Sequence, residues 1–564
     1  MLRELLGLFA ITLGSVSSGA QNARRSPGAS TSSRAERRAI RAFDSARRSP
    51  LDLHAFLERM PKGGDLHMHL DGAVYAETFL ADARADLLCV DPRTLSLTKN
   101  IGSTRSLPPQ PVCGEGHVPA ADAFPPAPEA QHLYNALVDS FSMRSFVPGP
   151  GNSGHDQFFS TFGRFSGIDK SHRGQWLGEV ATRAAAQNEQ YLEIMLTPHF
   201  TTAIAVANKL GWPESVTIQD FALPENAPAG MPASSTEYTT SNAQLAHLRD
   251  QLIADKSFQE NIGSAYKEFH DALQVRDAIE HCGAPNAADG CSVDIRFLYQ
   301  VLRSNPPQIV FAQTLLAFEI AAFEAKQPHP VVIGLNFVQP EDDYLAMSEY
   351  TRQMRMLDYL HTVYPQVHIA LHAGELAPGL VPPEGLLFHI REAIDLGHAE
   401  RIGHGVDVLY EQDPQALLKE MAERHIMVEI NLTSNDIILG ISLNRHSLPA
   451  YRSAGVPTAL STDDEGVSRI DLTHEYARAA NDFNLGYLDL KGMARTSIEH
   501  AFLPGVSLWS TPDTFTRVNV ACSGGPLGAD NPNARCLEFL RSSQKAAAQW
   551  QLEHRYAVFE SLLP

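Results

Sequence analysis

An alternation of short apolar runs with helical patterns constrains the fold of this chain more than any other feature. After a first run that ends near Leu70, further runs cover residues 191–196, 293–301, 331–337, 367–372, 401–404, 426–432 and 456–461. Most are separated by helical patterns, over 176–186, 243–279, 312–325, 347–363, 386–396 and 414–424. This order predicts an α/β fold, a (β/α)₈ TIM-type barrel with insertions after strands one and two; a doubly wound open sheet is the alternative.

The first run carries two histidines, His67 and His69, one residue apart. Residues i and i+2 of a strand share one face, so both imidazoles point the same way and could bind one metal ion. Taken alone, the pair is equally compatible with two histidines in an exposed turn.

Three later runs also end in residues that bind metals or transfer protons. The fifth strand is followed by His372 and Glu375, the sixth ends at His404, and the eighth is followed by Asp463 and Asp464. In a barrel these strand ends meet on one rim, where active sites lie. Imidazoles with a carboxylate suit zinc with an open position for water, and a further histidine and a carboxylic acid can move protons. The predicted reaction is hydrolytic.

Four motifs resemble those of the adenosine deaminase family, within the metal-dependent amidohydrolases. They are MPKGGDLHMHLDG at 60–72, HAGE at 372–375, RIGHG at 401–405 and STDD at 461–464. The resemblance extends from about Leu53 to His500. It implies one zinc ion per chain, bound by His67, His69, His372 and Asp463.

The resemblance also implies roles for four other residues. Glu375 would donate a proton to purine N1, and His404 would position and deprotonate the attacking water. Asp464 would hydrogen-bond to that water or to purine N7, and Asp71 would meet a ribose hydroxyl. Water would attack C6, so that adenosine, and by the same chemistry 2′-deoxyadenosine, would give inosine and ammonia.

One loop departs from the family pattern. Where the family usually has a glycine whose N–H meets purine N3, this chain has Gln339 followed by Pro340. Proline has no N–H, so Gln339 would have to serve through its backbone or its side chain. Two other functions stay open: a related amidohydrolase that deaminates another purine or amino-heterocycle, and a catalytically inactive secreted binding protein.

The N-terminal region and the cysteines indicate export. Residues 1–20 have the pattern of a signal peptide, residues 21–50 read as a flexible segment with a helix over 35–46, and 51–564 form the barrel. The six cysteines fall into three near pairs: Cys89 with Cys113, Cys282 with Cys291, and Cys522 with Cys536. Local disulfides are expected in an oxidising compartment, although six cysteines allow 15 pairings.

The insertion near 88–128, together with the export signal, resembles the secreted, growth-factor-like branch of the family. Secretion or periplasmic export is therefore expected. The formal net charge of −20 argues against a nucleic-acid partner, because such a surface needs clustered cations. A small nucleoside is the expected partner, no membrane span is expected, and a homodimer is an open alternative.

Overall fold

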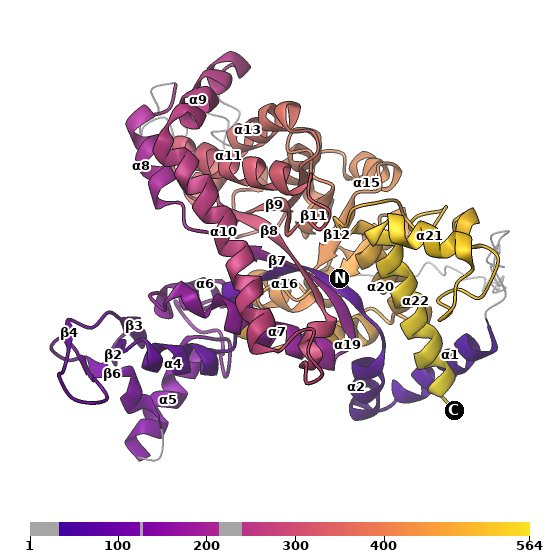
Figure 1. Cartoon of the computed structure of the whole chain (residues 1–564), viewed down its shortest axis with the longest axis horizontal. Coiled ribbons are helices and arrows are strands. Elements are labelled where there is room, and N and C mark those ends of the chain that lie inside the picture. The colour runs from indigo at the N-terminus through magenta and orange to yellow at the C-terminus, as the bar shows by residue number, and fades with distance from the viewer. Residues whose placement is uncertain (1–32, 125–127, 214–239) are drawn as a thin grey trace, which may run out of the picture.

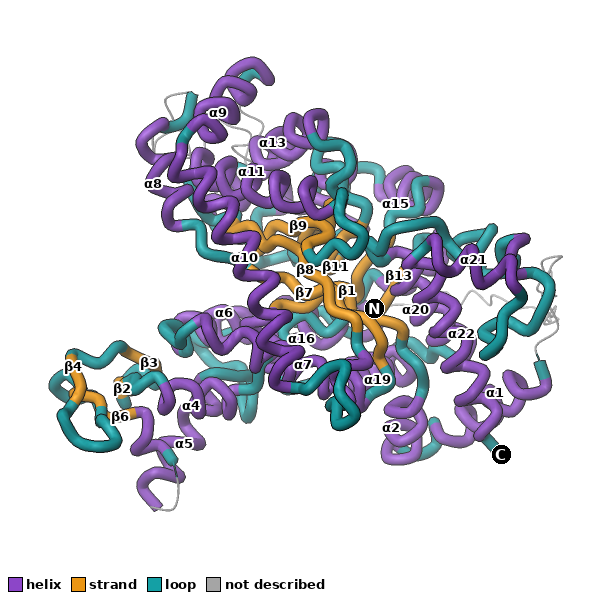
Figure 2. The backbone as a smooth tube through the Cα atoms, viewed as in Figure 1, coloured by secondary structure: helices purple, strands orange, loops and turns teal. Residues whose placement is uncertain are grey.

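The structure is a computed structural model that describes residues 33–124, 128–213 and 240–564. Within these residues one eight-stranded parallel sheet lies at the centre of the molecule, with helices around it (Figures 1 and 2). Its strands, in spatial order, are β1 Gly63–His69, β7 Glu189–Leu196, β8 Asp294–Leu302, β9 Val332–Val338, β10 His368–Ala373, β11 Arg401–His404, β12 Met427–Ile430 and β13 Thr458–Leu460. Each predicted run is therefore a strand, in chain order.

The first and last strands meet, which confirms the barrel and rules out the open sheet. Asp463, just beyond β13, donates its N–H to the carbonyl of His67 at 2.9 Å and accepts the N–H of His69 at 3.3 Å. This bridge is parallel, as between the other neighbours of the sheet. Two predicted metal ligands therefore lie beside a third at the seam of the barrel.

Helices follow most of the strands and cover the outside of the barrel. They include α7 Arg173–Ala186, α11 Pro307–Glu324, α13 Tyr350–Val363, α14 His389–Asp395, α15 Pro414–Glu423, α16 Leu432–Leu439, α17 Leu448–Ala454, α19 Leu472–Asp482 and α20 Tyr487–His500. Helix α11 begins with Pro307 at its first position, where a missing N–H costs nothing, and is buried along most of its length.

The helix predicted over 243–279 is divided into two. The pattern over 243–279 forms α9 Asn242–Ala254 and α10 Lys256–Ile279, because Asp255 between them has an extended backbone and caps the N–H groups of Ser257 and Phe258. In the same way, Ser543 separates α21 Ala534–Ser542 from α22 Gln544–Leu562. Local side-chain capping interrupts the helix in each case.

The insertion after the first strand forms an arm that extends away from the barrel (Figure 1). It begins with α3 Leu70–Ala73 and α4 Ala76–Ala85 and continues through β2 Cys89–Asp91, β3 Ser96–Thr98, β4 Gly102–Ser103, β5 Pro111–Val112, β6 Val118–Pro119, α5 Pro128–Ser140 and α6 Gly154–Arg164. All six cysteines are described, and they form the three local disulfides predicted from their order. One of these disulfides, between Cys89 and Cys113, lies in the arm.

The N-terminal and C-terminal helices lie together on one side of the barrel (Figure 1). Helix α2 Pro50–Arg59 leads into β1, and α1 Arg34–Ala46 buries Phe43 against Phe56 with ring centroids 5.5 Å apart. Arg38 of α1 donates to the carbonyl of Leu563 beyond α22. The helix expected over 35–46 is thus confirmed as α1, whereas the expected export signal lies outside the described residues. Among the described helices, none is both long and apolar enough to cross a membrane.

Candidate metal centre and active site

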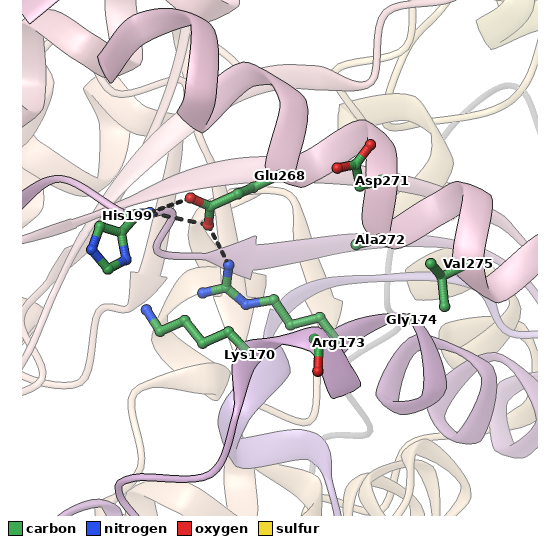
Figure 3. A pocket seen from close by; sticks show the side chains of 9 residues that line it. Lys170, Arg173, Gly174, His199, Glu268, Asp271, Ala272 and Val275 are labelled. Atoms are coloured by element: carbon green, nitrogen blue, oxygen red, sulfur yellow. Dashed lines mark hydrogen bonds and ion pairs between the residues drawn. The ribbon is translucent and has the colours of Figure 1, made fainter. Parts of the chain in front are cut away.

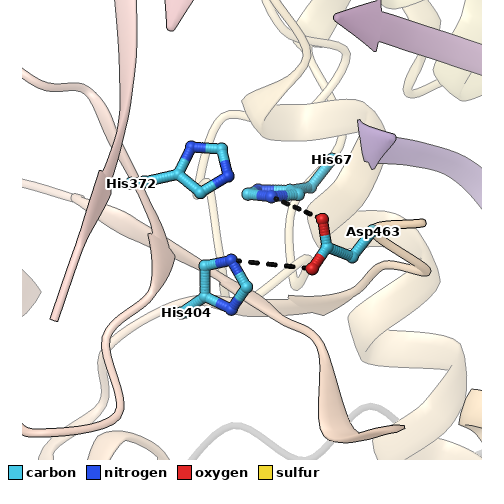
Figure 4. Close-up of side chains that lie close together, drawn as sticks. All are labelled: His67, His372, His404 and Asp463. Carbon is cyan, nitrogen blue, oxygen red and sulfur yellow. Dashed lines mark ion pairs between the residues drawn. The ribbon is translucent and has the colours of Figure 1, made fainter. Parts of the chain in front are cut away.

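Residues from four distant strands converge at the carboxyl ends of the barrel. Side chains of His67, His372, His404 and Asp463 face one another (Figure 4), with ligand atoms all within 4.8 Å of one another. Nε2 of His69 lies 3.3 Å from Nε2 of His372 and 3.3 Å from Oδ1 of Asp463. The four predicted ligands are therefore close together, and His404 adds a fifth donor to the cluster.

All four imidazoles are oriented in the same way, through Nδ1, by an oxygen from a neighbouring strand or helix. The pairs are His67 with Glu429 at 2.6 Å, His69 with Gln300 at 2.9 Å, His372 with Asn336 at 2.9 Å and His404 with Asn435 at 2.8 Å. Because these oxygens accept, each ring carries a proton on Nδ1 and directs Nε2 to the centre. Such outer partners are typical of metal-binding histidines.

The donor set fits a divalent metal of the zinc type. Nε2 of His67 is fully buried and makes no hydrogen bond to any residue that the structure describes. The carboxylate of Asp463 lies 3.5 Å from that atom and accepts a hydrogen bond from Ser434 at 2.7 Å. Neutral imidazole nitrogens with one carboxylate are the ligands that zinc prefers when an open position remains.

Two residues of the cluster have unusual backbone conformations. His404 and Asp463 have positive φ values of 68° and 62°, in the left-handed region that residues with a side chain rarely occupy. Each such residue costs about 1–3 kcal/mol and persists only where its surroundings fix it. The two backbone hydrogen bonds between Asp463 and β1 fix its conformation. The left-handed backbone of His404 and Asp463 turns both side chains toward the centre.

Glu375 and His404 have the environments of a proton donor and a proton acceptor. Oε1 of Glu375 lies 3.6 Å from Nε2 of His404, and both side chains are buried. Burial, then the charges of Asp463 and Glu341, raises the pKa of Glu375 well above its usual range. Burial lowers the pKa of His404 to about 4. Burial therefore favours the uncharged form of both groups, which is the protonated acid of Glu375 and the neutral imidazole of His404.

Asp464 and Asp71 lie on the part of the rim that follows β1 and β13. Asp464 is buried, and burial raises the pKa of its carboxyl well above the usual range. Its Oδ1 packs over Gly72, where a Cβ atom would lie only 1.5 Å away. Asp71, next to Gly72, is exposed at the rim. Glycine at 72 is therefore required by the close approach of Asp464.

Replacing Gly72 with alanine should push Asp464 out of the site, because the new methyl group and the carboxylate cannot occupy the same space. We expect kcat/KM for the proposed reaction to fall on the order of 10²-fold, the effect of misplacing a reacting group by about 1 Å. Steady-state kinetics would measure this. Gly163→Ala in α6, where a Cβ meets open space, is the matched control and should leave kcat/KM unchanged. An equal loss in both variants would contradict the role given to Gly72.

Gln339, which replaces the glycine usual in the family, has a glycine-like backbone with φ of 85°. Its side-chain oxygen accepts the N–H of Ser304 at 2.9 Å, and its carbonyl accepts a hydrogen bond from Arg303 at 2.8 Å. Purine N3 accepts a hydrogen bond, so a side-chain contact would have to come from Nε2 of Gln339, whose amide group is already held through Oε1 by Ser304. The backbone N–H is the better source.

Sequence reasoning missed the residues that orient the histidines. Gln300, Asn336 and Glu429 each lie in a strand that is otherwise mostly apolar and buried. A polar residue in such a run must find a partner, and this was the signal available in the sequence. The partner itself is distant in the chain, so only the fold identifies it.

A cavity of about 410 Å³ opens near the ends of α7 and β7 (Figure 3). Its lining includes Lys170, Arg173, His199 and Glu268. Glu268 accepts hydrogen bonds from the Arg173 guanidinium at 2.7 Å and from the His199 N–H at 3.1 Å. None of the predicted site residues lines this cavity.

Comparison with known proteins gives one family. The family model described as adenosine deaminase matches residues 268–507, which include the motifs of β10, β11 and β13 but not that of β1. An adenosine deaminase of Escherichia coli (strain SE11) is 38% identical over 137 residues, 24% of this chain and 38% of that protein. An adenine deaminase of Rhizobium leguminosarum bv. trifolii is 30% identical over 185 residues, 32% of this chain and 52% of that protein.

Among solved structures, the adenine deaminase of Arthrobacter aurescens is 14% identical, covering 78% of this chain and 94% of its own, with a TM-score of 0.47. By sequence, the chain spans 38% of the length of the Escherichia coli protein and 52% of the length of the Rhizobium protein. The family match covers three of the four motifs, and the fourth lies beside them on the same rim. Residues 268–507 thus match the adenosine deaminase family, and the comparisons support that family, within the metal-dependent amidohydrolases, for this chain.

Proposed function

We propose that this protein catalyses the hydrolytic deamination of adenosine, and of 2′-deoxyadenosine, to inosine and ammonia. The observation that carries the proposal is the convergence of a three-histidine, one-aspartate donor set with a buried acid and a buried neutral histidine. His67, His69, His372 and Asp463 would hold one zinc ion. When bound, zinc supplies a Lewis acid that makes water easier to deprotonate near neutral pH.

The other residues of the rim would move protons and orient the purine. His404, neutral and fixed by Asn435, accepts the proton of the attacking water at Nε2. Glu375, protonated, gives its proton to purine N1, which makes C6 a better target for water. Asp464, whose protonated form burial favours, donates to purine N7. Asp71 meets a ribose hydroxyl, and the Gln339 N–H meets purine N3.

The test is an assay of ammonia release from adenosine, 2′-deoxyadenosine and adenine. We expect turnover of the two nucleosides. Adenine is the second candidate, since one relative is named an adenine deaminase and Gln339 replaces the usual glycine. Turnover of adenine alone would show that the substrate is the free base and not its nucleosides. No turnover of any purine would favour the secreted binding protein.

Removing the metal should abolish this activity. Dialysis against a chelator is expected to reduce turnover to background while the protein stays folded, because the barrel core does not depend on the ion. Adding zinc back should restore turnover, as monitored by ammonia release together with circular dichroism. Full activity in the chelated, metal-free protein would contradict the proposed chemistry.

We also propose that the protein acts outside the cytoplasm, as a member of the secreted branch of the family. The three local disulfides and the arm after β1 support this. Disulfides persist in oxidising compartments. N-terminal sequencing of the exported protein should begin near Gln21, and recovery of an uncleaved cytoplasmic chain would contradict the proposal.

A further inference from the structure

Glu341 lies in the loop after β9, and its own buried carboxylate contacts the backbone just beyond the end of β10. The side chain is 1% exposed. Its Oε1 accepts the N–H of Gly374 at 3.1 Å, and its Oε2 accepts the N–H of Glu375 at 2.7 Å. Both oxygens of one carboxylate therefore hold two consecutive peptide groups, the second of which belongs to the proposed proton donor.

The backbone of β10 turns at Gly374 in a way that needs such an acceptor. Gly374 has φ of 74°, and a Cβ atom there would lie 2.4 Å from Oδ1 of Asp407. The turn presents two successive N–H groups to the buried interior. Each would cost about 1–3 kcal/mol if left without an acceptor, so the carboxylate of Glu341 stabilises this conformation.

Glu341 is itself held from a second side. Nδ1 of His389, the first residue of α14, lies 2.5 Å from Oε1 of Glu341. The His389 ring stacks on Tyr350 of α13, with centroids 3.9 Å apart, and Tyr350 donates to the His389 carbonyl. Three elements thus fix the carboxylate, and its position is set before any substrate binds.

We infer that Glu341 is a positioning residue for Glu375. By holding the peptide groups of Gly374 and Glu375, it fixes the origin of the Glu375 side chain opposite His404, where Oε1 and Nε2 are 3.6 Å apart. The hydrogen bonds described for Glu341 go to Gly374, Glu375 and His389, and none of these is a proposed metal ligand. The inference rests on the proposed function, in which Glu375 donates a proton to the purine.

Glu411 provides a matched control close by. It is 3% exposed, and its Oε1 accepts two consecutive N–H groups, from Ile390 at 2.6 Å and Arg391 at 3.3 Å. These belong to α14 and not to the end of β10. Glu411→Gln therefore makes the same chemical change at a buried carboxylate but keeps the one oxygen that accepts both N–H groups, and it does not release Glu375.

The test compares Glu341→Gln with Glu411→Gln in the full-length, metal-loaded protein. The N–H groups of 374 and 375 are accepted by different oxygens of Glu341, so glutamine leaves one of them facing an NH₂ group, which cannot accept it. We expect kcat to fall on the order of 10-fold or more in Glu341→Gln, with KM and metal content near wild type, because the acid is misplaced and not removed. Glu411→Gln, which keeps its accepting oxygen, should leave kcat unchanged. Glu341→Asp keeps two acceptor oxygens, so its kcat should lie between those of Glu341→Gln and Glu411→Gln. It replaces Glu341→Gln in the test if that variant fails to fold.

Amide hydrogen exchange separates this inference from the proposed function. Residues 374–376 should exchange faster in Glu341→Gln, or in Glu341→Asp, than in Glu411→Gln. Unchanged exchange there, or a kcat equal to that of Glu411→Gln, would overturn the positioning role while leaving the deaminase assignment intact. If the wild-type protein deaminates no purine, the proposed function fails, and hydrogen exchange alone then decides whether Glu341 holds this turn.

Discussion

Replacing Glu375 with glutamine is expected to lower kcat for adenosine deamination by about 10²-fold or more, the usual scale of general acid catalysis. Glutamine has nearly the same shape but no acidic proton to give to purine N1. Glu375 is outside the proposed ligand set, so the variant should keep its metal. Steady-state kinetics with metal analysis of the same preparation would show both effects.

The environment of Glu375 explains why the effect should be large. The side chain is 6% exposed, and burial raises its pKa well above the usual range, so the protonated form is available near neutral pH. A fully active Glu375→Gln variant would remove Glu375 from the mechanism, and loss of metal in that variant would place it among the ligands instead.

Replacing Asp463 with alanine should abolish metal binding, and activity with it. Asp463 is the carboxylate of the proposed ligand set, with Oδ1 3.5 Å from Nε2 of His67 and 3.3 Å from Nε2 of His69. Loss of an outer hydrogen-bond partner usually costs about 10–100-fold in metal affinity, and loss of a direct ligand should cost more. Titration of the apoprotein with zinc, followed by calorimetry, would measure the affinity.

Ser434 gives the matched control for Asp463. Its hydroxyl donates to Oδ2 of Asp463 at 2.7 Å without belonging to the proposed ligands. Ser434→Ala should weaken zinc affinity by about 10-fold, the lower end of the range for outer partners, and keep most of the activity. Wild-type affinity in Asp463→Ala would contradict the ligand set.

The strands and their order could be predicted because each is a short apolar run bounded by polar residues, and chain order fixes neighbours in a barrel. Since strand ends share one rim, the clusters at His67, His372, His404 and Asp463 could also be expected to meet. Their separation in the chain did not matter for this step. The structure confirms the barrel and brings these residues together.

Other features depended on contacts that the sequence pattern does not contain. The break at Asp255 arises from a side chain that caps the next helix, and helical periodicity continues across it. Gln300 and Asn336 were visible as polar residues in buried strands, but their partners are set by the barrel register. The positive φ of Asp463 follows from the barrel seam and could not be predicted locally.

The central claim is that His67, His69, His372 and Asp463 bind one divalent metal ion. An anomalous diffraction map from crystals of the protein, collected at the zinc absorption edge, tests it most directly. We expect one peak per chain, about 2.0–2.2 Å from the three Nε2 atoms and from a carboxylate oxygen of Asp463. The absence of a peak in zinc-loaded crystals, or a peak bound by His404 in place of His69, would contradict the account.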